Sequence, residues 1–300
     1  MKVSQLHNGA RHILASKGCR RRLDTRRFVS ALLPAFIVAC LWLPAPGHAS
    51  SIKIGGTGSA IGTMRILADA FQKTHPGLSI EIPKSVGSGG AVKGVLKGIF
   101  ALGVMSRPLR EKERKAGAIQ IPYAKTPFVF VTREGHGKDG LSFAELVSIF
   151  GGETTVWKDG TRIRLVLRPD SDSDTTLLKA KIPGMTAALA KARRVPGIPV
   201  AFTDQEALDG AETTKGVLTT GTLSSILSEN RPLVPIPING VAPTGENLAN
   251  GSYPLFKILS FVVSPKSSPL AKEFIRFVGS AEGAAILRKN GQLPVSPGKD

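Results

Sequence analysis

Three segments of this 300-residue chain place glycine and hydroxyl side chains where a helix is expected to begin. They are residues 56–60, residues 87–90 and residues 168–175. The first turn of a helix has backbone N–H groups without partners and a partial positive charge, so an anion is favoured there. Glycine allows close approach, Ser and Thr add O–H donors, and Arg168 adds a planar, permanently charged donor. Together the segments predict a site for a small oxyanion.

Enzyme motifs match this sequence poorly. The glycines at 56, 58 and 62 have GxGxxxG spacing, one residue longer than the dinucleotide fingerprint, and neither a phosphate-loop motif nor a G-x-S-x-G elbow occurs. Asp172 and Asp174 could be paired carboxylates for acid–base catalysis. Because they alternate with Ser171 and Ser173, turn and N-cap roles are favoured. We therefore expect a binding protein that is not an enzyme.

The first 49 residues predict a secretory signal peptide. A basic region over residues 2–27 precedes an apolar run over residues 28–43, and a small-residue stretch ends at Ala49. The run of about 16 residues is short for a membrane span. Residues 25–28 loosely resemble a twin-arginine signal, and residues 37–40 resemble a lipoprotein box ending at Cys40. Apolar residues after Cys40 favour plain cleavage after Ala49, which would release the protein into the periplasm.

Removing this leader changes the composition. Residues 1–49 hold eight Lys or Arg and one acid, so the net charge falls from +18 to +11. That charge suits anionic ligands, but it is scattered, and the few aromatic residues cannot stack on bases, so nucleic acid is not expected as a partner. Both cysteines and three of the five histidines leave with residues 1–49. No disulfide, cofactor or metal site is therefore predicted.

Short apolar strands alternate with amphipathic helices along the mature chain, which is typical of an α/β fold. Strands are expected near residues 52–54, 78–82, 100–105, 128–131, 162–168, 216–218 and 258–263. Helices are expected over residues 64–74, 87–96 and 143–150, after residue 221, and after Ser268. Ser142 is an expected N-cap, with Glu145 completing a capping box. No repeat or low-complexity linker occurs, which favours two lobes crossed more than once by the chain.

Five stretches resemble the phosphate-binding proteins of ABC importers, in the type II periplasmic binding protein superfamily. They are GGTGSAIGT (55–63), VGSGGAVKGVLKG (86–98), GVMSRPL (103–109), RPDSDSDTT (168–176) and INGVAPTGENLANGSYPL (238–255). The resemblance spans residues 52–295. It implies two α/β lobes with a hinge crossed twice, a monomer, and an anion held in the cleft and passed to a membrane ABC permease. We place lobe I at residues 50–125 plus 256–300 and lobe II at residues 126–255.

The resemblance also implies which residues bind the ligand. They are Gly58, Ser59, Ala60, Ser88, Ser106, Arg168, Ser173 and Thr175. The last two match the family's Ser-Gly-Thr if one residue is inserted after Arg168. Without that insertion the match falls on Asp172, Ser173 and Asp174, which would be poor anion ligands.

Two departures from the family pattern leave the anion open. Ser106 stands where the family has an aspartate that accepts a hydrogen bond from a protonated anion. A serine can donate or accept, so discrimination would relax. Asp174 stands where the family has glycine, which puts a carboxylate beside the expected anion. Phosphate is the first expectation. Sulfate, arsenate, an organic phosphate, and a signalling or adhesion role without transport are the alternatives.

Overall fold

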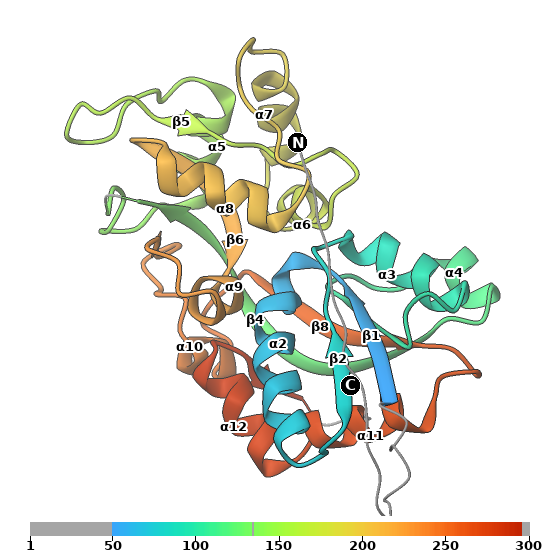
Figure 1. Cartoon of the computed structure of the whole chain (residues 1–300). Coiled ribbons are helices and arrows are strands. Elements are labelled where there is room, and N and C mark those ends of the chain that lie inside the picture. Colours follow the sequence, from blue (N-terminus) through green and yellow to red (C-terminus); the bar gives the residue numbers. More distant parts are fainter. Residues whose placement is uncertain (1–49, 134, 296–300) are drawn as a thin grey trace, which may run out of the picture. The chain divides into compact units, whose positions relative to one another are not determined.

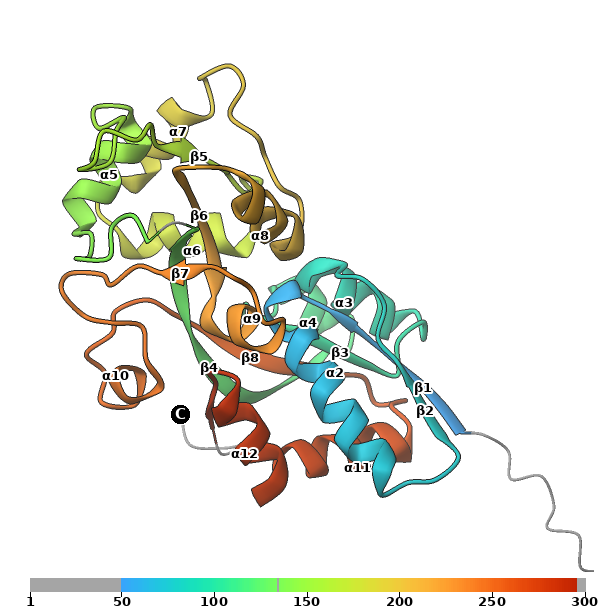
Figure 2. The same cartoon turned by 60° about the vertical axis from the view of Figure 1, so that its left-hand side comes forward.

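The strands of this protein form one mixed sheet in the order β2-β1-β3-β8-β4-β6-β5, with β7 and β9 pairing with β4 (Figures 1 and 2). The computed structural model describes residues 50–133 and 135–295, so the predicted leader, with Cys40 and Ala49, lies outside the described residues. The strands are β1 Ser50–Gly56, β2 Leu78–Glu81, β3 Leu102–Met105, β4 Ile119–Thr132, β5 Arg164–Leu165, β6 Val217–Thr222, β7 Val234–Pro235, β8 Phe256–Val263 and β9 Leu293–Pro294.

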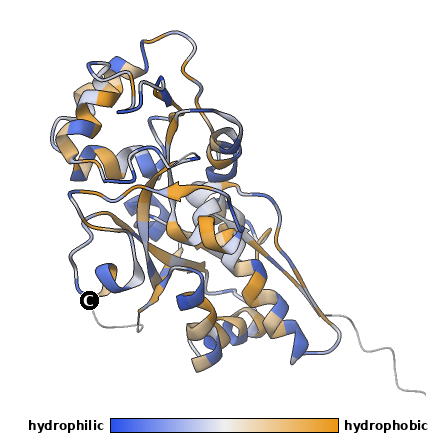
Figure 3. Ribbon diagram, turned by 90° about the vertical axis from the view of Figure 1, so that its left-hand side faces the viewer, coloured by the Kyte–Doolittle hydropathy of each residue, from blue (hydrophilic) through white to orange (hydrophobic). Residues whose placement is uncertain are grey.

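The helices cover this sheet and start mostly at polar caps. They are α2 Gly58–Lys73, α3 Gly87–Leu96, α4 Glu111–Lys115, α5 Phe143–Gly151, α6 Ser173–Lys181, α7 Met185–Ala192, α8 Asp204–Thr213, α9 Leu223–Ser228, α10 Gly245–Ala249, α11 Pro269–Val278 and α12 Ala281–Lys289. Figure 3 shows hydrophilic and hydrophobic turns side by side on the helices, as expected where one stripe packs inward. Among the described residues, no helix combines the length and apolar character needed to cross a bilayer.

The 14-residue strand β4 belongs to both halves of the sheet. Its first part, through Pro127, pairs antiparallel with β8, and residues 128–131 pair with β6. Proline removes a ladder hydrogen bond and is tolerated in strands at edges and irregularities. In agreement, the register shifts between Pro122 and Ala124, and Pro127 stands where β4 changes partner. The strands β4 and β8 therefore carry the chain between the two halves.

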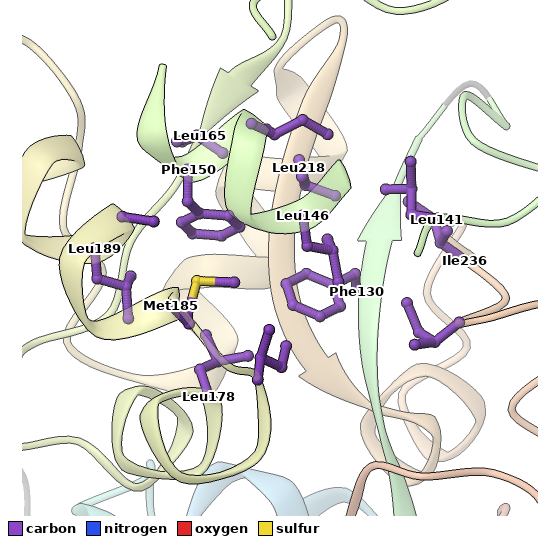
Figure 4. Close-up of a cluster of buried hydrophobic side chains, with 14 of the residues drawn as sticks. Phe130, Leu141, Leu146, Phe150, Leu165, Leu178, Met185, Leu189, Leu218 and Ile236 are labelled. Atoms are coloured by element: carbon purple, nitrogen blue, oxygen red, sulfur yellow. The ribbon is translucent and has the colours of Figure 1, made fainter. Parts of the chain in front are cut away.

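Four clusters of buried apolar side chains divide between these halves. Two draw on residues 52–124 and 259–287. The other two draw on residues 128–255, where the largest cluster packs Phe130 against Phe150, Leu146 and Met185 (Figure 4). The division into lobe I and lobe II at residues 125/126 and 255/256 remains our proposal, and we use these names below.

Local signals predicted several elements well. Ser142 caps α5, its side chain accepting from the Glu145 amide in the expected capping box, and Ser268 caps α11.

The lengths of two predicted strands were wrong. The strand expected over residues 162–168 is only Arg164–Leu165, because its partner β6 pairs there through Val217 and Leu218 alone. Conversely, β6 continues through residues 219–221, since β4 pairs with its other edge.

Core packing in lobe II predicts a large effect of Phe130→Ala. The Phe130 side chain is fully buried, with its ring centroid 6.1 Å from those of Phe128 and Phe150. We expect the substitution to lower the free energy of unfolding by about 3–5 kcal/mol, measured by urea denaturation. Phe202→Ala, at a side chain 74% exposed, is the matched control and should change it by less than about 0.5 kcal/mol. Equal losses would contradict this assignment of the core.

Candidate functional site

The first two predicted loops meet at the end of β3. The Val86 amide donates to the Gly56 carbonyl at 3.0 Å. The hydroxyl of Ser88 accepts from the Ser106 amide at 3.1 Å, and the hydroxyls of Ser106 and Thr57 lie 3.2 Å apart. These contacts hold the starts of α2 and α3 together, so their first-turn amides lie in the same region of lobe I.

A buried lysine joins this region to the third loop. Lys257 lies on β8, and its Nζ is 3.4 Å from the hydroxyl oxygens of both Ser59 and Ser173. Its side chain also forms an ion pair with Asp174. The structure therefore brings Ser59 and Ser173, from segments far apart in sequence, to one ammonium group.

The ion pair changes what Asp174 does in the site. Burial raises the pKa of the Asp174 carboxyl, but Lys257 and Arg168 outweigh it, so the pKa lies below the ordinary value. Burial likewise lowers the pKa of Lys257, and Asp174, Asp204 and Asp172 outweigh it, so that pKa is raised. Both groups are charged at neutral pH. Asp174 is thus neutralised by Lys257 and also accepts from Thr220 at 2.9 Å.

The Arg168 guanidinium is held from several sides, and one of its three nitrogens has no hydrogen-bond partner among the described residues. Its Nη1 donates to the Ala201 carbonyl at 2.9 Å and its Nη2 to Asp172 at 3.1 Å, while Asp204 lies 3.6 Å from Nη2. The buried Nε has no hydrogen-bond partner among the described residues, and the Asp174 carboxylate is 4.0 Å away. A buried N–H without a partner is costly, so a ligand oxygen would be favoured there.

Three carboxylates surround the two cations of this site. Asp172 caps α6, and Asp204 accepts from the Ser59 hydroxyl at 3.5 Å. Burial and the neighbouring Asp174 raise the pKa of Asp172 to about 6. The charges of this cluster therefore do not favour an anion by themselves. Directed hydrogen bonds from helix starts, hydroxyl groups and Arg168 would have to do so, helped by Arg107 and Arg110 on the wall of the adjoining cavity.

A cavity of about 470 Å³ lies against these groups, with walls from both lobes. Ser88, Arg168 and Ser173 line it, as predicted site residues. The remaining predicted site residues do not line this cavity. Ala60 is fully buried and its amide donates to the Thr57 carbonyl at 3.1 Å, and the Thr175 hydroxyl is turned to the Arg168 carbonyl at 3.4 Å.

Glycine is required where the first loop meets lobe II. A Cβ on Gly58 would lie 2.5 Å from the Asp204 carboxylate oxygen Oδ2. The Gly58 carbonyl also accepts from the Gln205 side chain at 3.2 Å. This close approach places the start of α2 directly against the start of α8.

Sequence reasoning missed Lys257 and Asp204. Lys257 lies within an apolar strand. A single lysine in such a strand needs a buried partner, and this indicates a polar or charged site in the interior. Asp204 opens α8, a helix that the periodicity did not predict, so nothing local pointed to it.

Two α/β halves joined by shared strands, with polar helix starts facing a cavity between them, define a binding protein of the type II periplasmic class. Residues 44–282 match the family described as PBP superfamily domain, and the chain belongs to this superfamily. The predicted fold class is confirmed, and the family is one of substrate-binding proteins, not enzymes.

Individual relatives are more distant. The chain is 25% identical to the phosphate-binding protein PstS of Bacillus subtilis over 82% of its own length and 81% of the relative. Among solved structures, it is similar to a putative phosphate ABC transporter substrate-binding protein with bound phosphate from Clostridium perfringens, with a TM-score of 0.71, 23% identity and coverage of 82% and 100%. A periplasmic molybdate-binding protein from Azotobacter vinelandii has a TM-score of 0.59, 16% identity and coverage of 82% and 99%. These structures share the fold.

The buried ion pair predicts a strong coupling between residues 257 and 174. Lys257→Met alone leaves the Asp174 carboxylate buried beside a guanidinium 4.0 Å away. We expect a loss of about 3–5 kcal/mol in the free energy of unfolding at neutral pH. The double variant Lys257→Met with Asp174→Asn should recover most of this loss. A double-mutant cycle by chemical denaturation measures the coupling, and additive effects would contradict the pair's role.

Proposed function

We propose that this protein captures phosphate in the cavity between its lobes and delivers it to a membrane ABC permease. The observation that carries the proposal is Arg168, which lines a cavity that polar helix starts face and whose buried Nε has no hydrogen-bond partner among the described residues. The likeness to a phosphate-binding protein and to a structure with bound phosphate supports phosphate as the anion. The predicted leader supports export to the periplasm with cleavage after Ala49, and we favour this over a lipid anchor at Cys40.

The proposed ligands come from both lobes. Lobe I offers the first amides of α2, at Gly58 and Ser59, and the hydroxyls of Ser88 and Ser106. Lobe II offers the Arg168 Nε and the hydroxyl of Ser173. We place Ala60 and Thr175 behind these groups, where they hold the helix start and the backbone of Arg168.

An anion that contacts both lobes favours the arrangement in which they approach. Ligand binding can shift an equilibrium between open and closed lobes only through contacts made better in one state. Here such contacts would come from Ser59 on one side and Ser173 on the other, which Lys257 already brings together. The permease could then distinguish loaded from empty protein by the position of the lobes.

Arginine and serine should contribute very differently to phosphate affinity. Arg168→Ala removes a permanent positive charge together with its donors, whereas Ser88→Ala removes one neutral hydroxyl donor. Arg168→Ala should therefore weaken phosphate binding by about 10- to 150-fold, equivalent to about 1.5–3 kcal/mol, and Ser88→Ala by about fivefold, in calorimetric titrations. Arg164→Ala is a matched control, because this exposed arginine donates to the Lys215 carbonyl outside the cavity. Similar losses for Arg168→Ala and Ser88→Ala would place Arg168 outside the site.

Asp172 should make phosphate affinity depend on pH. Its pKa of about 6 means that the side chain loses its negative charge as the pH falls through this value. Asp172→Asn should bind phosphate up to about tenfold more tightly than the parent protein near pH 8, with the difference narrowing near pH 5.5. The ratio of the two affinities cancels the ionisation of phosphate itself. A ratio that stays constant with pH would show that Asp172 does not face the anion.

A further inference from the structure

A second cavity, of about 690 Å³, adjoins the anion cavity and has a different chemical character. Its apolar walls come from lobe I, from α6 of lobe II and from β8, which with β4 connects the two halves of the sheet; β4 and β8 are called the hinge strands below. They include Pro108, Leu109, Leu177, Ala180, Phe256 and Ile258. No carboxylate occurs among the described residues that line it, whereas Asp172 and Asp204 line the anion cavity. Arg107, Arg110, Lys181 and Lys257 also line it, so the second cavity combines apolar walls with positive charge. It therefore suits the apolar part of a ligand that carries no positive charge of its own.

The two cavities are continuous. Arg107, Arg110, Ser171 and Ser173 line both. Lys257 lines the second cavity, and its ammonium lies 3.4 Å from the hydroxyls of Ser59 and Ser173. A phosphate group held by Ser173 and Arg168 would thus stand at the boundary, where one of its oxygens can carry a substituent into the apolar space.

The second cavity is large enough to hold an organic group. Pockets of about 300–1,000 Å³ hold whole organic ligands, and inorganic phosphate has no atoms to fill such a space beyond the anion cavity. Apolar walls such as Phe256 and Ile258, half-buried at the hinge, gain from contact with an apolar group that displaces water. A protein that binds only inorganic phosphate would need neither the volume of this second cavity nor its apolar walls.

We propose that the ligand is an organic phosphate: a phosphate monoester whose phosphate group occupies the anion cavity and whose apolar alcohol part occupies the second cavity. This inference rests on the proposed function, because it uses the same anion site. It names the substrate class of that site more narrowly than phosphate alone.

The test compares three phosphates on the mature protein by isothermal titration calorimetry. Phenyl phosphate should bind at least about tenfold more tightly than inorganic phosphate, because its ring buries apolar surface against the walls of the second cavity. Glycerol 3-phosphate, with a polar alcohol part, should gain much less. Phenyl phosphate binding no tighter than inorganic phosphate would overturn the inference.

A filled cavity separates this gain from a general effect. Ala180→Trp places a large side chain in the second cavity from an exposed position on α6. It should abolish the advantage of phenyl phosphate and leave the affinity for inorganic phosphate unchanged. Ala187→Trp, at an exposed alanine on α7 outside both cavities, is the matched control and should keep the advantage. If Ala180→Trp keeps the advantage, the apolar part lies elsewhere and the inference fails.

The outcomes also distinguish this inference from the proposed function. Binding of inorganic phosphate without a gain for phenyl phosphate leaves the proposed function standing and removes only the inference. No binding of any of the three compounds removes both.

Discussion

The ion pair between Lys257 and Asp174 is the interaction on which the arrangement of the site depends. Both side chains are almost fully buried, and taking two charges out of water costs several kcal/mol per ion unless they pair well and find further hydrogen bonds. Each charge does find further partners: Thr220 donates to Asp174, and Ser59 and Ser173 lie beside the ammonium. Because the pair links β8 to the start of α6, it also holds Ser173 beside Ser59 at the start of α2.

This pair explains how a carboxylate is tolerated beside an anion site. Taken from the sequence alone, Asp174 argues against an anion ligand at the start of α6. In the structure, the charge of Asp174 is neutralised by Lys257, which lies far from it in the sequence. Arg168 is shared with Asp172 and Asp204, so at this point an anion would be held mainly by directed donors, while Arg107 and Arg110 add positive charge on the cavity wall. A site of this kind discriminates by geometry and protonation more than by the number of charges on the ligand.

Local patterns predicted the helix starts, because capping is decided within a few residues. Ser142, Ser268 and the glycine loops before α2 and α3 are of this kind. The hinge strand β4 was predicted only in part, since Pro122 and Pro127 interrupt its pattern and only the pairing with β8 keeps the chain extended. Lys257 and Asp204 contact Asp174 and Ser59, which lie more than eighty residues away in the sequence. The apolar residues around Lys257 indicate that it needs a buried partner, but local spacing does not identify that partner. The resemblance implied a set of ligand residues, which stays a prediction, and it did not indicate the ion pair between Lys257 and Asp174.

The register of the two hinge strands sets both cavities at once. Thr126 pairs with Lys257, while Lys125 and Pro127 pair with Ile258 and Phe256. Successive side chains of a strand point to opposite faces, and in this register the ammonium of Lys257 reaches the ion cluster. A slip of one residue would turn Phe256 or Ile258 toward the carboxylates in place of the ammonium. The ion pair with Asp174 penalises that slip, because an unpaired buried carboxylate would remain. The same contact that neutralises Asp174 therefore fixes the register that places Phe256 and Ile258 in the wall of the second cavity.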